Sequence, residues 1–296
     1  MVELPRPNSV HSASPVPLDI MQGGSQARQS NYRQSMKRPD YRNLQFTCAT
    51  LWGLFFTTAI FTSFPEIDLW VARLFAAPDG SFPLAANPAL GLLRNFYKLL
   101  FILLFSVSVT MLLFNLRVRR DTKIPTKIWG FVCAVFLLGP GLLVNVILKD
   151  NWGRARPSQI EEFGGAAQFT PPLLFADECK RNCSFVSGEG ATIASVMIVL
   201  VTLLWHAFPD RRRLLVAGAV AVGISGAFLR VIKGRHFLSD TLFAALFSAL
   251  VILVLYGLFN IRKHRRAISL PALRHDFGAV WIELADAIRR VKHRLM

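Results

Sequence analysis

The chain has 296 residues, of which 53% are hydrophobic and only 18% are charged. An ordinary soluble domain needs fewer apolar residues to fill one core, so this composition excludes a plain soluble enzyme. Lys and Arg outnumber Asp and Glu by 34 to 18, which gives a formal net charge of +16. In a soluble chain this excess favours a nucleic-acid partner, but here the charges separate apolar blocks and indicate a bilayer instead.

Six apolar blocks approach the length of about 20 residues that crosses roughly 30 Å of hydrocarbon. We therefore expect an all-α fold, an integral membrane bundle of six transmembrane helices. The expected spans are approximately residues 46–64, 98–116, 128–148, 191–207, 214–229 and 241–260. Pro140 falls inside the third span, where it predicts a kink whose freed backbone groups are met by neighbouring helices.

The charges between the spans predict an orientation. Six spans place both termini on one side, and the segments on that side carry 23 of the 34 basic residues, leaving 11 for the other side. The positive-inside rule makes the more basic side cytoplasmic. Three loops then face outward, at residues 65–97, at 149–190 and around 230–240.

The two ends of the chain differ from the apolar block between them. Residues 1–44 are rich in Ser, Pro, Gln and Asn and lack the continuous apolar stretch of a cleavable signal peptide, so we expect a disordered cytoplasmic segment. Residues 45–260 form the expected six-span membrane domain. Residues 261–296 predict a basic amphipathic cytoplasmic helix on the inner leaflet, and packing on a cytoplasmic partner is the alternative.

Three groups of polar and charged residues stand at the outer ends of the expected spans, where ionic groups are expensive and need an explanation. They fall on one predicted face of the membrane. In chain order they are Lys149 with Arg156-Pro157, Ser187 with Gly188, and Arg230 with His236 and Asp240. Each group alone also fits a structural role, as an interfacial anchor, a helix cap or a hydrogen-bonded pair, but their convergence favours a phosphate site.

These patterns, Lys-x6-Arg-Pro, then Ser-Gly, then Arg-x5-His-x3-Asp, resemble the three-part signature of the type 2 phosphatidic acid phosphatase family of membrane lipid phosphatases. The resemblance covers about residues 46–260, and the six-span layout matches as well. It implies that His236 and Asp240 are catalytic. It also implies a set of phosphate-binding residues, namely Lys149, Arg156, Ser187, Gly188 and Arg230.

The residue types suit the same chemistry. Two guanidinium forks and one ammonium can stabilise the negative charge of a phosphate ester, and backbone N–H groups at the start of a helix add donors. His236 can attack phosphorus to form a phosphohistidine that water then hydrolyses. Asp240, one helical turn later, can hold the imidazole in the right tautomer and stabilise its positive charge. No metal or other cofactor is implied.

The chain departs from the family pattern at residue 189. The family has Pro-Ser-Gly-His, whereas this chain reads Val186-Ser187-Gly188-Glu189, so the histidine expected to protonate the leaving alkoxide is a glutamate. Only His236 among the six histidines is predicted to face outward, so no other histidine can replace it. Glu189 can be the acid if apolar surroundings or a bound anionic phosphate favour its protonated form.

The outer loops carry two further expectations. Cys179 and Cys183 are close enough in sequence to close a small disulfide ring in an oxidising compartment, whereas a metal site would need further ligands, and the disulfide remains open. The loop at residues 65–94, which contains Ile67 to Val71, is expected to lie at the membrane interface and shape the entrance to the site.

We therefore expect a metal-independent lipid phosphatase of the cell inner (plasma) membrane, with both termini cytoplasmic and the active site on the periplasmic face. Candidate substrates are lipid A, isoprenyl pyrophosphate, phosphatidylglycerol phosphate and phosphatidic acid, and the long third-to-fourth-span loop resembles the lipid A phosphatase branch. A lipid-to-lipid phosphotransferase, an undecaprenyl pyrophosphate phosphatase and a catalytically decayed lipid-binding membrane protein are the alternatives. The sequence indicates no nucleic-acid partner and leaves the oligomeric state open.

Overall fold

A computed structural model describes residues 41–118 and 122–295, and residues 45–296 form one compact unit. The N-terminal segment expected to be disordered lies outside the described residues up to residue 40, and its last four residues, 41–44, are helical instead. In the described part of the chain the regular elements are helices, and an isolated bridge between Ile160 and Ala167 is the one trace of β pairing. The expected all-α fold is confirmed.

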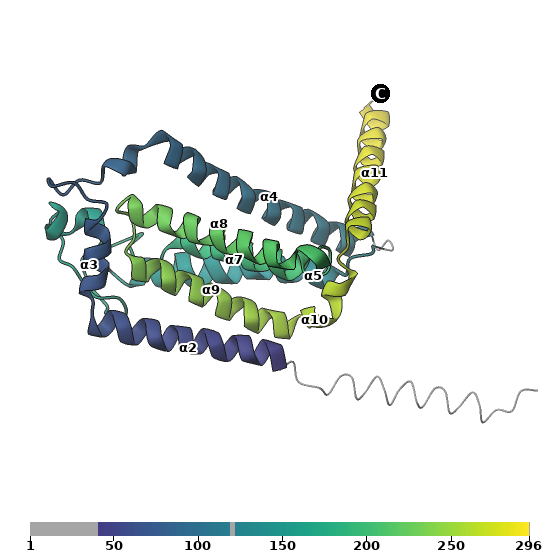
Figure 1. The fold of residues 1–296 in the computed structure, drawn as a ribbon. Helices are drawn as coiled ribbons and strands as arrows, with labels where there is room; N and C mark the ends of the chain where they lie inside the picture. The colour runs from purple at the N-terminus through teal and green to yellow at the C-terminus, as the bar shows by residue number, and fades with distance from the viewer. Residues whose placement is uncertain (1–40, 119–121, 296) are drawn as a thin grey trace, which may run out of the picture. The chain divides into compact units, whose positions relative to one another are not determined.

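Most of the chain lies in long helices (Figure 1). They are α2 (Tyr41–Ser63), α4 (Pro88–Val118), α5 (Thr126–Phe136), a π-helix that continues α5 (Leu137–Leu148), α7 (Gly188–Leu204), α8 (Arg212–Ile232), α9 (Leu238–Leu258) and α11 (Leu270–Leu295). Shorter helices are α3 (Glu66–Arg73), α6 (Lys149–Asn151) and α10 (Ile261–His264). Five helical stretches of the described chain are long and apolar enough to cross a membrane, and α7 is a shorter apolar helix. These are the six expected spans.

Helix α7 is the centre of the bundle, because it contacts α4, α5, the π-helix, α8 and α9. Its 17 residues would reach only about 25 Å at the usual helical rise, which is slightly less than the hydrocarbon thickness. Small residues such as Gly190, Ala191 and Ser195 let the neighbouring helices approach it closely. The start of this central helix is therefore surrounded by protein rather than by lipid.

The predicted irregularity at Pro140 is present as the π-helical segment. Proline has no N–H to donate and disturbs the regular α-helical hydrogen bonds around it. The side-chain amide of Asn145 donates to the carbonyl oxygen of Pro140 at 2.7 Å, so a residue of the same segment, rather than a neighbouring helix, satisfies that carbonyl. The wider turn carries Lys149 to the end of the span.

Helices α2, α4 and α8 expose large apolar side chains, which an aqueous surface would not favour and a bilayer would. Examples are Trp52, Phe55, Leu92, Phe96, Leu214 and Ile224. The main core lies between the helices and includes Phe131, Val135, Val196 and Ile252. The chain is thus a multi-pass membrane protein with a protein core around α7.

The connections between helices gather at the two ends of the bundle. Residues 64–87, 149–187 and 233–237 lie together at one end, which we call the site end, and α10 and α11 lie at the other (Figure 1). At that other end the buried carboxylate of Asp276 in α11 accepts the backbone N–H groups of Lys123 and Ile124, both at 2.9 Å. The first half of α11 is therefore attached to the membrane bundle through the loop before α5.

Candidate active site

His236 lies in the turn between α8 and α9, and only 1% of its surface is exposed. Its Nδ1 lies 2.8 Å from the backbone carbonyl oxygen of Ser184. Because a carbonyl oxygen can only accept, Nδ1 carries the hydrogen and Nε2 keeps its lone pair. Burial lowers the pKa of His236 to about 4, so the imidazole is neutral near pH 7. A neutral ring with a free Nε2 lone pair is the form that can attack phosphorus.

Asp240 binds the α8–α9 turn and the loop before α7, the two segments that position this ring. Its Oδ2 accepts from the backbone N–H of Phe237 at 2.9 Å and from the hydroxyl of Ser184 at 2.5 Å. The same oxygen lies 3.7 Å from Nδ1 of His236. The sequence predicts that Asp240 itself fixes the tautomer, whereas here the Ser184 carbonyl takes the Nδ1 hydrogen. The carboxylate stays near enough to stabilise a positive charge on the ring.

A fully buried guanidinium, that of Arg154, continues this network. It donates to Oδ1 of Asp240 at 2.6 Å and to Oδ2 of Asp68 at 2.8 Å. Its carbon atom Cζ also lies 4.2 Å from the ring centre of Phe237, within the range of a cation–π contact. Buried charges persist in proteins when they are paired and hydrogen-bonded, and this arginine has two carboxylate partners and four hydrogen bonds in all.

The loop expected at the membrane interface takes part in the same network. It contains α3, whose Asp68 is completely buried and accepts the backbone N–H of Ser239 at 2.9 Å. Trp70 of the same helix is exposed. Only one face of α3 is therefore available to an interface, because the other face is fixed to the first turn of α9.

Two of the expected phosphate-binding cations, Lys149 and Arg230, act on the same histidine. Their positive charges both contribute to the low pKa of His236, after the larger effect of burial. Nε of Arg230 is buried and has no hydrogen-bond partner among the described residues. Oε2 of Glu189 lies 3.6 Å from this nitrogen, close enough for an ion pair but too far for a hydrogen bond, so the N–H can still donate to an anionic ligand.

The third cation, Arg156, is partly buried in the loop that follows α6. One of its terminal nitrogens donates to the backbone carbonyl of Asn182 at 2.7 Å, which holds the side chain across the loop. Burial and the charge of Arg235 lower the pKa of Arg156. Cations that crowd together in this way favour the binding of a polyanion.

Ser187 and Gly188 form the beginning of α7. The Ser187 hydroxyl accepts the backbone N–H of Gly190 at 3.2 Å and thus caps the helix, while its own N–H donates to the carbonyl of Asp240. A Cβ atom on Gly188 would lie 2.5 Å from Oδ1 of Asn145 and 3.5 Å from Nζ of Lys149. Only glycine allows the start of the helix, where first-turn N–H groups and the dipole favour anions, to approach the lysine so closely.

Comparisons with known proteins identify the family of the chain. The model of the PAP2 superfamily matches residues 127–263. The protein named Lipid A 4'-phosphatase from Francisella tularensis subsp. novicida (strain U112) is 33% identical over 213 residues, which cover 71% of this chain and 93% of the relative. The chain belongs to the PAP2 superfamily.

Proteins with the same name from two other organisms match this PAP2 chain. The one from Rhizobium etli is 33% identical and covers 73% of this chain and 87% of its own, and the one from Rhizobium leguminosarum is 32% identical and covers 73% and 97%. A crystal structure of a transmembrane PAP2 type phosphatidylglycerolphosphate phosphatase from Bacillus subtilis aligns at a TM-score of 0.47 and 20% identity, and covers 74% of this chain and 96% of that one. The family match and the three relatives, each at least 32% identical, show that this PAP2 chain is a membrane lipid phosphatase, a phosphoric monoester hydrolase.

Glu189, where this PAP2 chain departs from the family pattern, does not lie in apolar surroundings. Its two carboxylate oxygens lie 3.0 and 2.9 Å from Nε of Arg94, a terminal nitrogen of Arg94 contacts the carboxylate as well, and Nε of Arg230 lies 3.6 Å away. Two guanidinium groups stabilise the charged carboxylate. An ion pair therefore stands in place of the apolar surroundings that would favour a protonated carboxyl, and a bound phosphate remains as the route to a protonated Glu189.

The long loop before α7 is fixed at several points. The structure joins Cys179 and Cys183 in a disulfide, which the sequence analysis left open. The backbone N–H of Cys183 donates to the carbonyl of Lys149, and that of Ser184 donates to the carbonyl of Arg154 at 2.8 Å. These bonds hold the loop against the residues that surround His236.

Sequence reasoning did not assign roles to four residues of this site: Asp68, Arg94, Arg154 and Ser184. A signal was present for Arg154, because KDNWGRARP contains two arginines and only the second belongs to the family motif. A weaker signal was present for Asp68, because it stands between Ile67 and Leu69 in a short apolar run, where an acid with no partner is unfavourable. Arg94 and Ser184 gave no comparable signal, because their partners lie 95 and 56 residues away in the sequence.

Proposed function

We propose that the chain removes a phosphate monoester from lipid A through a phosphohistidine at His236. The observation that carries this proposal is the buried neutral imidazole, whose Nδ1 donates to the Ser184 carbonyl so that Nε2 remains free. Lys149, Arg156 and Arg230 supply the positive charge that a phosphate needs. Lipid A as the substrate is supported by the names of the three relatives, each of which is matched over most of its length.

The proposed reaction has two steps. In the first, Nε2 of His236 attacks phosphorus, the bond from phosphorus to the lipid oxygen breaks, and the leaving oxygen takes a proton from Glu189. In the second, water attacks the phosphohistidine, Glu189 takes the proton of that water, and inorganic phosphate leaves. Asp240 stabilises the positive ring in between, and Arg154 keeps Asp240 in place.

Glu189 must become protonated before it can act as the acid. An incoming phosphate monoester places up to two negative charges beside the carboxylate. Its oxygens also compete with the carboxylate as hydrogen-bond acceptors for Arg230 and Arg94. Both changes disfavour the charged carboxylate. We infer that substrate binding itself prepares the acid, which explains why a glutamate that is ion-paired in the empty site can take the place of a histidine.

We place the site end of the bundle at the periplasmic face of the inner membrane, with both termini in the cytoplasm. The charge distribution of the segments between spans supports this orientation. In this arrangement residues 45–260 carry the activity and residues 261–296 lie against the inner leaflet. A lipid headgroup reaches His236 while its chains remain in the bilayer.

The first test is phosphate release by the purified protein in detergent, with a chelator present. The substrates are lipid A, isoprenyl pyrophosphate, phosphatidylglycerol phosphate and phosphatidic acid, and the variants are wild type, His236→Ala and, as a folded control, His264→Ala at the other end of the bundle. We expect lipid A to be hydrolysed fastest, with no release by His236→Ala. A different best substrate would refute the lipid A assignment, and activity that survives in His236→Ala would refute the nucleophile.

The second test separates an acid role of Glu189 from a structural one. A general acid matters for an alkoxide leaving group and hardly at all for a nitrophenolate, which leaves without a proton. Glu189→Gln should therefore slow formation of the phosphohistidine from alkyl phosphates by about 100-fold or more and leave its formation from nitrophenyl phosphate, measured as the first-turnover burst of nitrophenolate, nearly unchanged. Equal losses on both substrates would show that Glu189 only positions Arg94 and Arg230, and Arg94→Gln is the matched variant for that outcome.

A further inference from the structure

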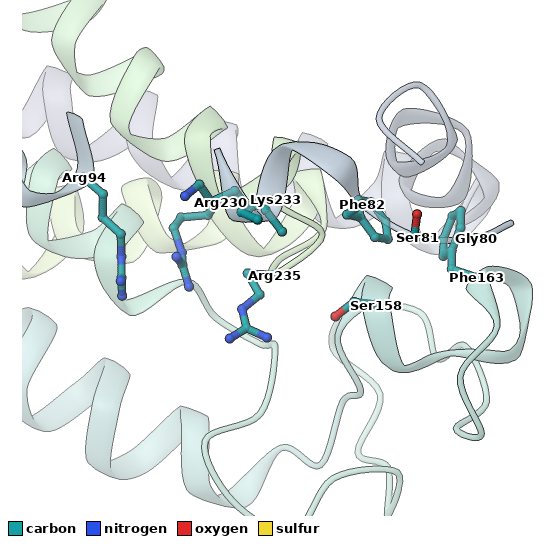
Figure 2. Close-up of a pocket in the computed structure, with 11 residues that line it drawn as sticks. Gly80, Ser81, Phe82, Arg94, Ser158, Phe163, Arg230, Lys233 and Arg235 are labelled. Atoms are coloured by element: carbon teal, nitrogen blue, oxygen red, sulfur yellow. The ribbon is translucent and has the colours of Figure 1, made fainter. Parts of the chain in front are cut away.

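A second basic pocket adjoins the proposed phosphate site. Its volume is about 540 Å³, and Figure 2 shows the side chains that form it. Four of the lining residues are cationic: Arg94, Arg230, Lys233 and Arg235. In Figure 2 the guanidinium groups of the three arginines extend toward the same side of the pocket. No Asp or Glu is among the lining residues.

Two of the four cations of this pocket lack a counter-charge among the described residues. Glu189 is ion-paired with Arg94 and lies near Arg230, but Lys233 and Arg235 have no carboxylate within ion-pair distance in the part of the chain that the structure describes. Lys233 is only 8% exposed. Burial and the charges of Arg230 and Arg94 lower the pKa of Lys233. An ammonium held close to other cations and without a carboxylate partner favours the binding of an anion.

The walls of the pocket are rigid and preformed. Gly234 has a positive φ of 63°, and a Cβ atom on it would lie 2.4 Å from the ring of Phe82. The carbonyl of Gly234 accepts the backbone N–H of Ser158 at 3.1 Å, and Phe82 packs edge-on against Phe163. The α8–α9 turn, the loop before α4 and the loop after α6 are thus locked together. This rigidity keeps Lys233 close to its neighbouring cations instead of letting it move into water.

Arg230 connects this pocket to the proposed site of reaction. Its side chain lines the pocket, and its charge also acts on His236. A single ligand can therefore reach both places if it carries two anionic groups. Charge-assisted hydrogen bonds from guanidinium and ammonium groups suit phosphate and carboxylate oxygens.

We propose that this pocket binds a second anionic group, a phosphate or a carboxylate, on the headgroup whose phosphate monoester is cleaved at His236. The inference rests on the proposed function and deepens it: the enzyme selects polyanionic headgroups. Lys233 and Arg235 are the specificity residues, because they belong to this pocket and not to the proposed catalytic set. Arg230 serves both anions.

The test compares two lipids that share one acylated glucosamine disaccharide. One carries phosphate at both ends, and the other carries only the phosphate that is cleaved. We expect wild type to prefer the bisphosphorylated lipid by about tenfold or more in kcat/KM, mainly through KM. Lys233→Gln with Arg235→Gln should bring this ratio close to one, because it lowers kcat/KM on the bisphosphorylated lipid far more than on the monophosphorylated one.

The matched control removes two exposed cations from the same end of the bundle, with Arg73→Gln and Lys180→Gln. It should keep the preference of wild type, so a general loss of surface charge can be distinguished from a loss of the pocket. Equal kcat/KM of wild type on the two lipids would overturn the proposal. A pocket variant that loses activity on both lipids equally would overturn it as well.

Added inorganic phosphate distinguishes a headgroup from a free ion. If free phosphate were the natural occupant, it would raise the rate on the monophosphorylated lipid to that on the bisphosphorylated one, which would contradict the headgroup assignment. If the headgroup is the occupant, phosphate should only inhibit.

If neither glucosamine lipid is hydrolysed, the proposed substrate is refuted. A binding experiment still tests the pocket in that case. Equilibrium dialysis with radiolabelled inorganic phosphate counts the anions bound by each purified chain without any turnover. Wild type should bind two phosphates, and Lys233→Gln with Arg235→Gln should bind one. Equal counts for the two proteins would overturn the pocket independently of the substrate.

Discussion

At the scale of single residues, Arg154 organises the site through Asp240, and the proposed reaction gives it no contact with the substrate. It is completely buried between the carboxylates of Asp68 and Asp240, which come from α3 and α9. One positive charge thus separates two negative ones that would otherwise face each other in a medium of low polarity. The position of His236 depends on this balance, because Asp240 accepts the backbone N–H of the next residue, Phe237, and the hydroxyl of Ser184, whose carbonyl in turn accepts from the imidazole ring.

We expect Arg154→Met to destabilise the protein by about 3 to 5 kcal/mol, because it leaves buried carboxylates without a counter-charge. Combining it with Asp68→Asn should recover part of this loss, since one of the two charges is then removed. Thermal unfolding in detergent measures both effects, and Arg73→Met, at an exposed arginine of the same helix as Asp68, is the control. An Arg154→Met variant as stable as wild type would show that the network does not contribute to folding.

At the scale of elements, the active geometry depends on how closely the start of α7 approaches the π-helix. Asn145 has two functions at this contact: its amide nitrogen satisfies the carbonyl of Pro140, and its oxygen lies where a side chain on residue 188 would have to go. The π-helix, the glycine and Lys149 therefore act as one unit. A regular α-helix through Pro140 would turn Lys149 to a different direction.

We expect Gly188→Ala to lower kcat/KM by about 100-fold while the protein stays folded, because the added methyl group pushes the start of α7 away from Lys149 by a distance of the order of 1 Å. Asn145→Gly with Gly188→Ala should be more active than Gly188→Ala alone, since the atom that clashes is then missing. Phosphate release by the two single variants and the double variant gives this comparison as a double-mutant cycle. Strictly additive losses would contradict the steric explanation.

At the scale of the whole molecule, the sequence predicts the spans and the three motifs because these signals are local. Runs of apolar residues mark the helices, and the motif residues stand next to them in the sequence. Contacts between distant segments leave no such mark. Arg154 lies 86 residues from Asp68 and from Asp240, and Glu189 lies 95 residues from Arg94. The partner of Glu189 decides its charge, so its chemistry could not be derived from the pattern around it.

The orientation of the molecule in the membrane is the remaining property that the charge distribution predicts and that labelling can test. Glu161 lies in an exposed position of the site end, and Lys263 lies in α10 at the other end. In a Cys48→Ser background, the variants Glu161→Cys and Lys263→Cys each present one exposed thiol, because Cys133 is buried and Cys179 is bonded to Cys183. A maleimide that cannot cross the inner membrane should label position 161 in cells with a permeabilised outer membrane, and position 263 only after the inner membrane is opened. The reverse pattern would place the site end in the cytoplasm and would show that the 23 basic residues on one side do not set the topology of this chain.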